Sequence, residues 1–400
     1  MHLSFEAVAE PRPGPRWQAL FRRYWPAYRA WLIHRDRPGR PTPGQSRAAL
    51  QRYMPELLAT YDRLLELADG DPLAARLLSC YRPPAYLISC SQAALDTPTG
   101  PLLVRNYDLD PSLNEGLILH SRWSGRRVMG TSEFLWGLAD GLNDAGLAVS
   151  LAFGGRRAVG DGFGIPLIVR YLLEVCDDLH EAVAALHAVP SHMAYNLTLL
   201  DRRGRSATVE VGPNRPLRVR QPALATNHQG TVEWAEHGRF TATVKRAECL
   251  RRHLADPATD PDALVDAFLG PPLYNTDYGN GFGTLYTAVY RPTGGSAGWH
   301  WPGAVWRQTL DDFREGARQV HYSAAGARVA DPGIHADPVC HGATTTADLD
   351  PALAAVRAGL AAGGCRLAPA LQAWFAEAGR GGRIPWERLG SAIASQYRGR

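Results

Sequence analysis

Short β-type runs at hairpin spacing dominate the chain from residue 86 to about residue 303. The runs YLISCSQAAL (86–95) and GPLLVRNYDL (100–109) flank a four-residue connection with Gly100 closing the turn, which predicts a β-hairpin. Further runs of this kind are LILHSRW, GLAVSLAFG, AYNLTLLD, SATVEVG, PALATN, TLYTAVY and GWHWPG. This pattern, interrupted by helical stretches, favours two antiparallel sheets stacked on each other and covered by helices, a layered α+β fold.

Helical spacing of apolar residues predicts helices over about 15–35, 45–79, 165–189, 241–255 and 260–269. Within the third stretch, Asp178 and Glu181 fit a capping box. The end of the chain carries two more helical patterns, PALAAVRAGLAAG and PALQAWFAEAG. We therefore expect a helical segment over 1–89, a catalytic core over 90–324 and a helical C-terminal extension over 325–400.

Composition excludes several classes of protein. The chain has 400 residues, of which 45% are hydrophobic and 20% charged, and its net charge of +4 is scattered. Without a basic stripe interleaved with aromatic residues, we expect no nucleic-acid partner. No run approaches the roughly 18–20 apolar residues of a membrane span, and Glu6, Glu10 and prolines stand where a signal peptide would be apolar. Six sparse cysteines without framework spacing then indicate reduced thiols in the cytoplasm.

Cys90 lies in the first strand of the predicted hairpin. A lone cysteine in an apolar strand is usually a small buried hydrophobe. Here, however, the returning strand carries Arg105, Asn106 and Asp108, and a turn centred near residues 98 and 99 places Cys90 opposite Tyr107 or Asp108. Because charged side chains are costly in a core strand unless they are paired, this neighbourhood favours a catalytic thiol.

A thiol attacks an amide as the thiolate and needs a base. If cleavage of the Ser89–Cys90 bond makes Cys90 the N-terminal residue, its own α-amine, with a reference pKa of about 7.7–8.0, can be that base. Asp108 would orient or stabilise the ammonium group. Arg105 would balance Asp108 and lower the pKa of the thiol. This arrangement explains why no histidine partner is evident.

Four segments in order resemble a known family: SCSQAAL…GPLLVRNYDLD, GLADGLNDAGLAVSLAFGG, YNLTLLDRRG…VEVGP and LATNHQG. The resemblance covers about residues 75–300 and is to the acyl-coenzyme A:6-aminopenicillanic-acid acyltransferase family. That family is related to choloylglycine hydrolases and penicillin V acylase, within the N-terminal-nucleophile (Ntn) hydrolases.

The resemblance implies an αββα four-layer sandwich and autocatalytic cleavage before the cysteine, so that residues 1–89 become a pro-segment or small chain. It also implies that Cys90 is the nucleophile, with Arg105 and Asp108 beside it, and that the amide N–H of Asn227 holds the oxyanion. Such a donor stabilises the transition state of acyl transfer by roughly 3–4 kcal/mol. Ser89 departs from the glycine that family members often have before the nucleophile.

Other candidates for substrate contact are Asn106, Tyr107, Asn196 and Arg291. Asn196 is equally a hydrogen-bonded residue at a strand end, and Arg291 before a proline is usually a solvated surface residue. His228 follows Asn227 in the chain and faces the other way in a strand, which favours a structural role. The segment GWHWPGAVW (298–306) either walls an acyl pocket or fills the core between the sheets.

No metal or cofactor is expected. HEAVAALH (180–187) has the wrong separation for HExxH, no CxxC pair exists, and GDGFG (160–164) does not follow the dinucleotide-binding pattern. The segment DGLND (140–144) is most simply a turn, where Gly141 and Asn143 tolerate unusual backbone angles. The expected partner is a small-molecule amide or acyl-thioester, with a homo-oligomer left open.

Two alternatives remain at the level of sequence. One is an unprocessed Cys–His hydrolase that uses a histidine elsewhere, such as His120. The other is a catalytically silent scaffold that keeps the Ntn fold as a binding protein, with Ser89 as the feature that blocks maturation.

Overall fold

A ten-stranded sheet is the larger of two sheets in the computed structural model, which describes residues 1–35, 39–280 and 282–330. Its strand order is β10-β9-β8-β7-β6-β5-β4-β1-β16-β17. The strands are β1 His2–Glu10, β4 Leu117–Ser121, β5 Val128–Glu133, β6 Gly137–Asn143, β7 Leu147–Phe153, β8 Tyr195–Asp201, β9 Ser206–Val211, β10 Arg218–Arg220, β16 Gly316–Ser323 and β17 Gly326–Val329.

The second sheet has seven strands and carries the predicted hairpin. Its order is β11-β2-β3-β13-β14-β15, with β12 paired to β13. The strands are β2 Ser89–Leu95, β3 Leu102–Leu109, β11 Leu224–Ala225, β12 Thr276–Asp277, β13 Phe282–Arg291, β14 Ser296–Trp301 and β15 Ala304–Thr309. Contacts of β2 and β3 with β7 and β8 show that the two sheets stack face to face.

Helices cover the outer faces of both sheets. On the larger sheet α5 (Ile165–Val175) packs against β6 and β7, and α6 (Leu179–Ala188) packs against β8 and β9. On the smaller sheet α8 (Thr243–Ala255) and α9 (Pro261–Phe268) bury Leu250, Leu264 and Phe268 against β2, β3 and β13. The expected α+β four-layer αββα sandwich is therefore confirmed.

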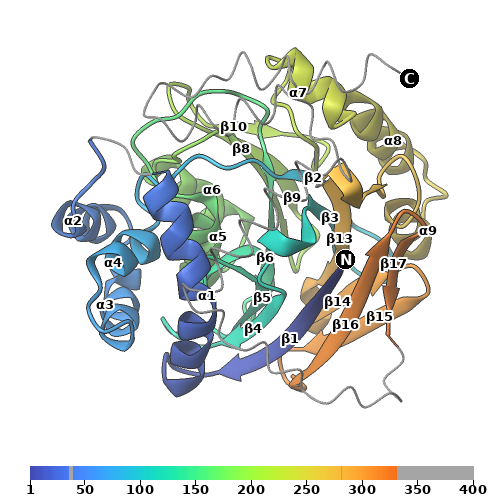
Figure 1. Cartoon of the computed structure of the whole chain (residues 1–400). Helices are drawn as coiled ribbons and strands as arrows, with labels where there is room; N and C mark the ends of the chain where they lie inside the picture. Colours follow the sequence, from blue (N-terminus) through green and yellow to red (C-terminus); the bar gives the residue numbers. More distant parts are fainter. Residues whose placement is uncertain (36–38, 281, 331–400) are drawn as a thin grey trace, which may run out of the picture.

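The remaining helices lie in the N-terminal segment or beside α8. They are α1 Pro15–His34, α2 Pro43–Tyr53, α3 Leu58–Leu67, α4 Pro72–Ser79 and α7 Ala235–Phe240, with short 3-10 turns η1 Pro55–Leu57, η2 Pro111–Leu113, η3 Tyr278–Asn280 and η4 Pro292–Gly294. Figure 1 shows α1 to α4 (blue) gathered on one side of the molecule and α8 and α9 on the other.

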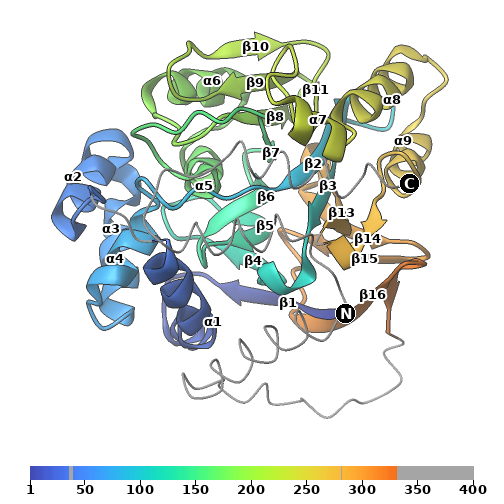
Figure 2. The same ribbon diagram turned by 45° about the horizontal axis from the view of Figure 1, so that its top comes forward.

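The expectation that the first 89 residues are helical is wrong for residues 2–10. This segment is β1, which pairs in parallel with β4 and antiparallel with β16 and is the third strand from the β17 edge of the larger sheet. Figure 2 shows β1 running from the N-terminus toward the side of the molecule that holds α1. The alternation of apolar and polar residues along β1 is hard to recognise in the sequence, because Glu6 and Glu10 interrupt the apolar run. Phe5 and Ala7 are nevertheless buried. The N-terminal segment is thus an integral part of the sandwich.

Two other differences between the structure and the sequence-based expectations depend on proline and glycine residues. The stretch 45–79 is three helices, because Pro55 and Pro72 stand at the starts of new helical turns. Residues 140–143, expected as part of a turn, lie in β6. Gly137 and Gly141 let α5 approach this strand, since an added Cβ would lie 2.8 Å from Pro166 Cβ and 2.9 Å from Leu173 Cδ1.

Asp178 caps α6 as expected, accepting hydrogen bonds from the backbone N–H groups of His180 and Glu181 at 3.0 and 3.1 Å. The predicted helix over 165–189 is therefore two helices, with the second beginning at this cap. Of the predicted C-terminal extension, residues 326–329 form β17, and residues 331–400, with both helical patterns, lie outside the described residues.

Candidate active site

The hairpin of β2 and β3 sets which side chains can meet at Cys90. Cys90 pairs with Tyr107, as expected, and Ser89 pairs with Asp108. Because successive side chains on a strand alternate, Cys90 and Tyr107 face the larger sheet, whereas Ser89 and Asp108 face the helical side. The Cys90 side chain is fully buried between the sheets. Polar side chains therefore lie on both faces of the sheet at the Ser89–Cys90 bond.

Arg105 is the partner of the thiol on the inner face. Its Nη2 donates to Cys90 Sγ at 3.3 Å, and its Nε donates to the carbonyl of Leu151 at 3.1 Å. Among the described cysteines, Cys90 alone accepts a hydrogen bond from a guanidinium group. Burial raises the pKa of the Cys90 thiol to about 12, and the nearby Arg105 charge opposes this rise. A base is therefore needed to form the thiolate near neutral pH.

Arg105 is not the ion-pair partner of Asp108, although its charge still lowers the pKa of Asp108. Its buried ion pair is with Asp140 of β6, and its Nη1 also donates to the Tyr286 hydroxyl at 3.0 Å. Asp140 lies on the residue run that had been interpreted as a turn. In a strand, its side chain projects from the larger sheet toward β3. The glycines of that run hid the strand, which is why Asp140 was missed.

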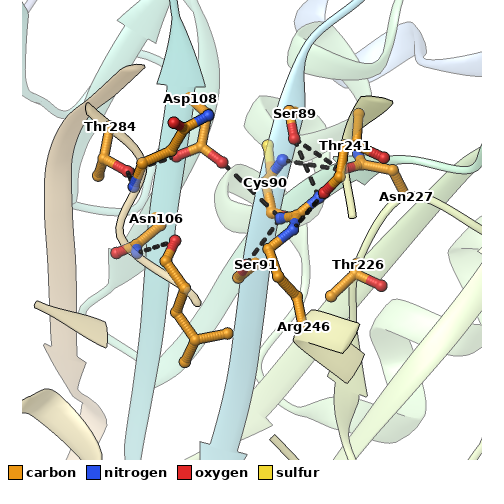
Figure 3. Close-up of polar contacts among 12 residues, drawn as sticks. Ser89, Cys90, Ser91, Asn106, Asp108, Thr226, Asn227, Thr241, Arg246 and Thr284 are labelled. Carbon is orange, nitrogen blue, oxygen red and sulfur yellow. Dashed lines mark hydrogen bonds and ion pairs between the residues drawn. The ribbon is translucent and has the colours of Figure 1, made fainter. Parts of the chain in front are cut away.

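Arg246 of α8 is the other functional candidate that the sequence did not reveal. Figure 3 shows its guanidinium group beside the strand that carries Ser89 and Cys90. Its donors reach the Cys90 carbonyl at 2.6 Å, Ser91 Oγ at 2.8 Å, Ser89 Oγ at 3.1 Å and Asn227 Oδ1 at 2.6 Å. The side chain is almost fully buried. Arg246 thus holds both residues of the Ser89–Cys90 bond in place.

Helical spacing contains the signal that could have found Arg246. It precedes Leu250 by four residues and Cys249 by three, and both of these are buried. Residues at these separations lie on one face of a helix. An arginine on the apolar face of an otherwise charged helix needs a buried acceptor, which is a reason to expect a site there.

Asp108 lies beside the Ser89–Cys90 bond on the helical side of the sheet. Thr284 Oγ1 donates to its carboxylate at 2.7 Å, and Arg246 Nη1 lies 3.7 Å from it (Figure 3). Burial raises the pKa of Asp108, while Arg246 and Thr284 oppose the rise. The ion-pair partner of Asp108 is therefore Arg246, in the place where the sequence had suggested Arg105.

Asn227 contacts the same peptide bond through its carbonyl oxygen. Asn227 Oδ1 accepts from the Cys90 backbone N–H at 3.2 Å and from Ser89 Oγ at 2.9 Å. Its Nδ2 donates to the carbonyls of Phe153 at 3.2 Å and Ile88 at 3.4 Å. The amide donor expected for the oxyanion is thus engaged by the backbone of Ile88, and its role as an oxyanion donor stays a prediction.

Three of the predicted substrate contacts lie away from the thiol. Asn106 faces α9 and donates to the carbonyls of Phe268 and Leu273, on the side opposite the Cys90 side chain. Asn196 donates to the carbonyls of Thr226 and His228 and so fixes the residues on either side of Asn227. Arg291 ends β13 five residues beyond Tyr286, about 17 Å along the strand at the usual rise per residue.

Tyr107 does lie at the thiol. The guanidinium carbon of Arg105 lies 4.3 Å from the centroid of the Tyr107 ring. The same guanidinium group forms the ion pair with Asp140. Trp299 and Trp301 are buried in the inter-sheet core, where their ring N–H groups donate to Thr131 Oγ1 and the Leu285 carbonyl. This favours the core interpretation of the tryptophan-rich segment.

The histidines are engaged elsewhere. His120 stacks on Phe313 with ring centroids 5.0 Å apart, and His228 Nδ1 lies 2.9 Å from Thr243 Oγ1. Among the described residues, no histidine nitrogen hydrogen-bonds to Cys90 Sγ. The same part of the chain holds no cluster of three potential metal ligands and no helix long and apolar enough to cross a membrane.

Comparison with known structures returns hydrolases and an acylase at low identity. A mutant of the conjugated bile acid hydrolase from Clostridium perfringens is 13% identical, covering 59% of this chain and 97% of that chain, with a TM-score of 0.42. Penicillin V acylase from Agrobacterium tumefaciens is 14% identical over 61% and 98%, with a TM-score of 0.38. A Caenorhabditis elegans N-acylethanolamine-hydrolyzing acid amidase orthologue is 16% identical over 57% and 98%, with a TM-score of 0.39. No curated protein matches the chain.

A family model gives the assignment. The family described as acyl-coenzyme A:6-aminopenicillanic acid acyl-transferase matches residues 95–303, just over half of the chain. Arg105, Asp108, Asn227 and Arg246 lie inside this range, and Cys90 lies five residues before it. The chain therefore belongs to the acyl-coenzyme A:6-aminopenicillanic acid acyltransferase family, a family with the Ntn-hydrolase fold whose enzymes act on amide bonds by hydrolysis or acyl transfer.

Proposed function

We propose that the protein is a self-processing cysteine amidase or acyltransferase, in which cleavage of the Ser89–Cys90 bond makes Cys90 the N-terminal nucleophile. The observation that carries this proposal is the set of side-chain contacts on the two residues that form that bond. Asn227 accepts from the Cys90 N–H, and Arg246 donates to the Cys90 carbonyl and the Ser89 hydroxyl. Among the described cysteines, Cys90 alone has both its backbone N–H and its carbonyl bonded to side chains.

In the cleavage step, the Cys90 thiol loses its proton and its sulfur attacks the Ser89 carbonyl carbon. A C–S bond forms, the C–N bond breaks, and the Cys90 nitrogen takes up a proton to become an amine. Water then hydrolyses the thioester, which gives the Ser89 carboxylate and regenerates the thiol. The contact between Asn227 Oδ1 and the Cys90 N–H supports this step, because it orients the nitrogen that becomes the leaving group.

In turnover, the new α-amine takes the proton of the Cys90 thiol, and the thiolate attacks the carbonyl of a substrate amide or acyl-thioester. The Arg105 guanidinium favours the thiolate, as its contact with Sγ indicates. Asp108, paired in the chain with Ser89, lies where it can stabilise the ammonium form of the amine. The leaving amine or thiol departs with the proton, and water or an amine then accepts the acyl group from Cys90.

Once Ile88 no longer follows the path of the intact chain, Asn227 Nδ2 loses one of its two carbonyl acceptors. That N–H would then be available to the oxyanion of the tetrahedral intermediate. Removing a donor of this kind from an acyl-transfer site costs roughly 10²–10³ in kcat. On this proposal, maturation exposes the nucleophile and the oxyanion donor in the same event.

Mass spectrometry of the purified full-length chain tests the proposal. We expect a fragment that begins at Cys90 and a partner fragment that ends at Ser89, with both absent from Cys90→Ala. A Cys90→Ser variant provides a matched nucleophile that is expected to cleave more slowly. Amide turnover by a chain that stays intact would contradict self-processing, and turnover by Cys90→Ala would contradict the assignment of the nucleophile.

A further inference from the structure

The segment that leads into Cys90 is held by its side chains and not by its backbone. Among the described residues, residues 84–87 take part in no backbone–backbone hydrogen bond, although β2 begins only two residues later. Tyr86 and Leu87 nevertheless pack against the main core. The Tyr86 ring stands edge-on to Phe134, with centroids 5.4 Å apart. This segment is also the acyl half of the bond that we propose Cys90 cleaves.

Two buried polar groups meet here that make no hydrogen bond of ordinary length. The Tyr86 hydroxyl is shielded from solvent and has no hydrogen-bond partner within 3.5 Å, and the same holds for Glu133 Oε2 at the end of β5. Burial raises the pKa of Glu133 to about 7, with Glu115 raising it further and with Arg105 and the hydroxyls of Tyr107 and Tyr86 opposing. A buried acceptor is normally satisfied, so an orphan one marks a place where a donor is expected.

These groups lie on the same side of β2 and β3 as the thiol. Tyr107, which is opposite Cys90, stacks against Arg105, and Arg105 donates to Cys90 Sγ. Burial raises the pKa of Tyr86, and Glu133, Tyr195 and Tyr107 lie close enough to raise it further. The Tyr86 side chain therefore fills the inter-sheet space next to the nucleophile.

Cleavage would free this space without releasing the N-terminal segment. β1 stays paired with β4 and β16, so the first 89 residues remain part of the sandwich. After cleavage, however, residues 84–89 would have a free C-terminal end and no backbone hydrogen bond over residues 84–87 to retain them. The space that Tyr86 fills is then open to an acyl group attached to Cys90.

We propose that this space is the acyl-binding site of the processed enzyme, and that it selects an uncharged aromatic acyl group with a hydroxyl at its far end, which donates to Glu133. The proposal rests on the proposed function, because it places the acyl half of a substrate where the acyl half of the cleaved bond lay. Phe134 supplies an aromatic wall for such a group, since its ring contacts the Tyr86 ring edge-on. Glu133 is the specificity-determining residue.

Binding to the uncleavable full chain tests the site independently of catalysis. In Cys90→Ala, Tyr86 keeps its place, so 3-(4-hydroxyphenyl)propanamide is expected not to bind by calorimetry. In Cys90→Ala with Tyr86→Ala, the same probe should bind about tenfold more tightly than 3-phenylpropanamide, as one hydrogen bond to a buried acceptor allows. Adding Glu133→Met should reduce the ratio of the two affinities to about one. Equal affinities before Glu133 is changed, or binding with Tyr86 in place, would overturn the proposal.

Kinetics of the processed enzyme give a second measurement, which also decides the matter if the Tyr86→Ala variant does not fold. Two substrates are compared, the 4-nitroanilide of 3-(4-hydroxyphenyl)propanoic acid and the 4-nitroanilide of 3-phenylpropanoic acid. We expect kcat/KM to be about tenfold higher for the first. Glu133→Met should abolish this ratio, whereas Glu66→Met, at an exposed position on α3, should keep it. Equal kcat/KM values for the two anilides in the wild-type enzyme would contradict the proposed specificity. Cleavage of neither anilide, with the binding result intact, would instead count against the proposed catalytic function.

Discussion

The carboxylate of Asp140 binds the guanidinium group of Arg105 in the middle of the sandwich, and both side chains are fully buried. Hydroxyl groups of Tyr286, Tyr290 and Thr131 also donate to Asp140. The larger sheet thereby fixes the side chain whose other terminal nitrogen lies 3.3 Å from Cys90 Sγ. The thiol on one sheet is thus positioned by an acidic residue on the other.

Asp140→Asn is expected to lower the free energy of unfolding by about 3–5 kcal/mol, because it leaves the Arg105 charge buried without a counter-charge. Chemical denaturation of the Cys90→Ala background measures this without interference from cleavage. Asp144→Asn is the matched control, since Asp144 pairs with Arg127 at a partly exposed site and should cost less than about 1 kcal/mol. Equal losses in the two variants would contradict the structural role of Asp140.

A double variant separates the role of Arg105 in stability from its role at the thiol. Combining Asp140→Asn with Arg105→Met removes both charges, so we expect much of the stability lost in Asp140→Asn to return. Cleavage or amide turnover should still fall at least 100-fold, because the guanidinium donor to Cys90 Sγ is gone. Unfolding curves and the rate of fragment formation, measured on the same preparation, decide the matter. Recovery of activity together with stability would show that Arg105 acts only as a structural residue.

The layered fold and the Cys90 hairpin could be predicted because they depend on local patterns. Alternating apolar residues and a short turn fix the register of β2 and β3, so that Cys90 and Tyr107 pair as expected. β1 and β6 were missed because glutamates and glycines replace the apolar residues that mark a strand, and long-range pairing decides their structure. Local propensity carries no information about such partners.

The charge pairing at the site could not be predicted for the same reason. Arg105 and Asp108 are three residues apart on one strand, so they point to opposite faces of the sheet. Each takes its partner from an element far away in sequence, Asp140 from β6 and Arg246 from α8. Nearness in sequence suggested one pair, whereas the alternation of the strand produces two.

Ser89→Gly is expected to accelerate cleavage about five- to tenfold. The Ser89 hydroxyl donates to Asn227 Oδ1 and accepts from Arg246 in the uncleaved chain. Removing contacts that stabilise the uncleaved state, worth about 1 kcal/mol for one hydrogen bond, lowers the barrier if the transition state does not keep them. The half-time of fragment formation after synthesis measures the effect. Ser91→Ala removes a different contact of Arg246 and should bring no acceleration; slower cleavage of Ser89→Gly would show that the hydroxyl assists the reaction.

Arg246→Met is expected to reduce cleavage by at least 100-fold and to lower the free energy of unfolding by about 3–5 kcal/mol. It removes the donors to the Cys90 carbonyl and Asn227, and it leaves Asp108 buried without its counter-charge. Arg252→Met, on the exposed face of the same helix, is the matched control and should change neither quantity measurably. If Arg246→Met cleaves at the wild-type rate, Arg246 has a structural role and no role in cleavage.

Glu133 makes stability depend on pH in a defined direction. Because burial raises its pKa from 4.5 to about 7, the folded state favours the protonated form, and this contribution to stability is complete below pH 4.5. It is lost as the pH rises through 7, by up to about 3 kcal/mol for a shift of this size. In the Cys90→Ala background, Glu133→Gln should therefore gain stability relative to its parent between pH 5 and pH 8 in urea unfolding. Glu66→Gln, at an exposed position, should follow its parent at both pH values. If Glu133→Gln also follows its parent, the Glu133 carboxyl is not the buried group that sets this pH dependence.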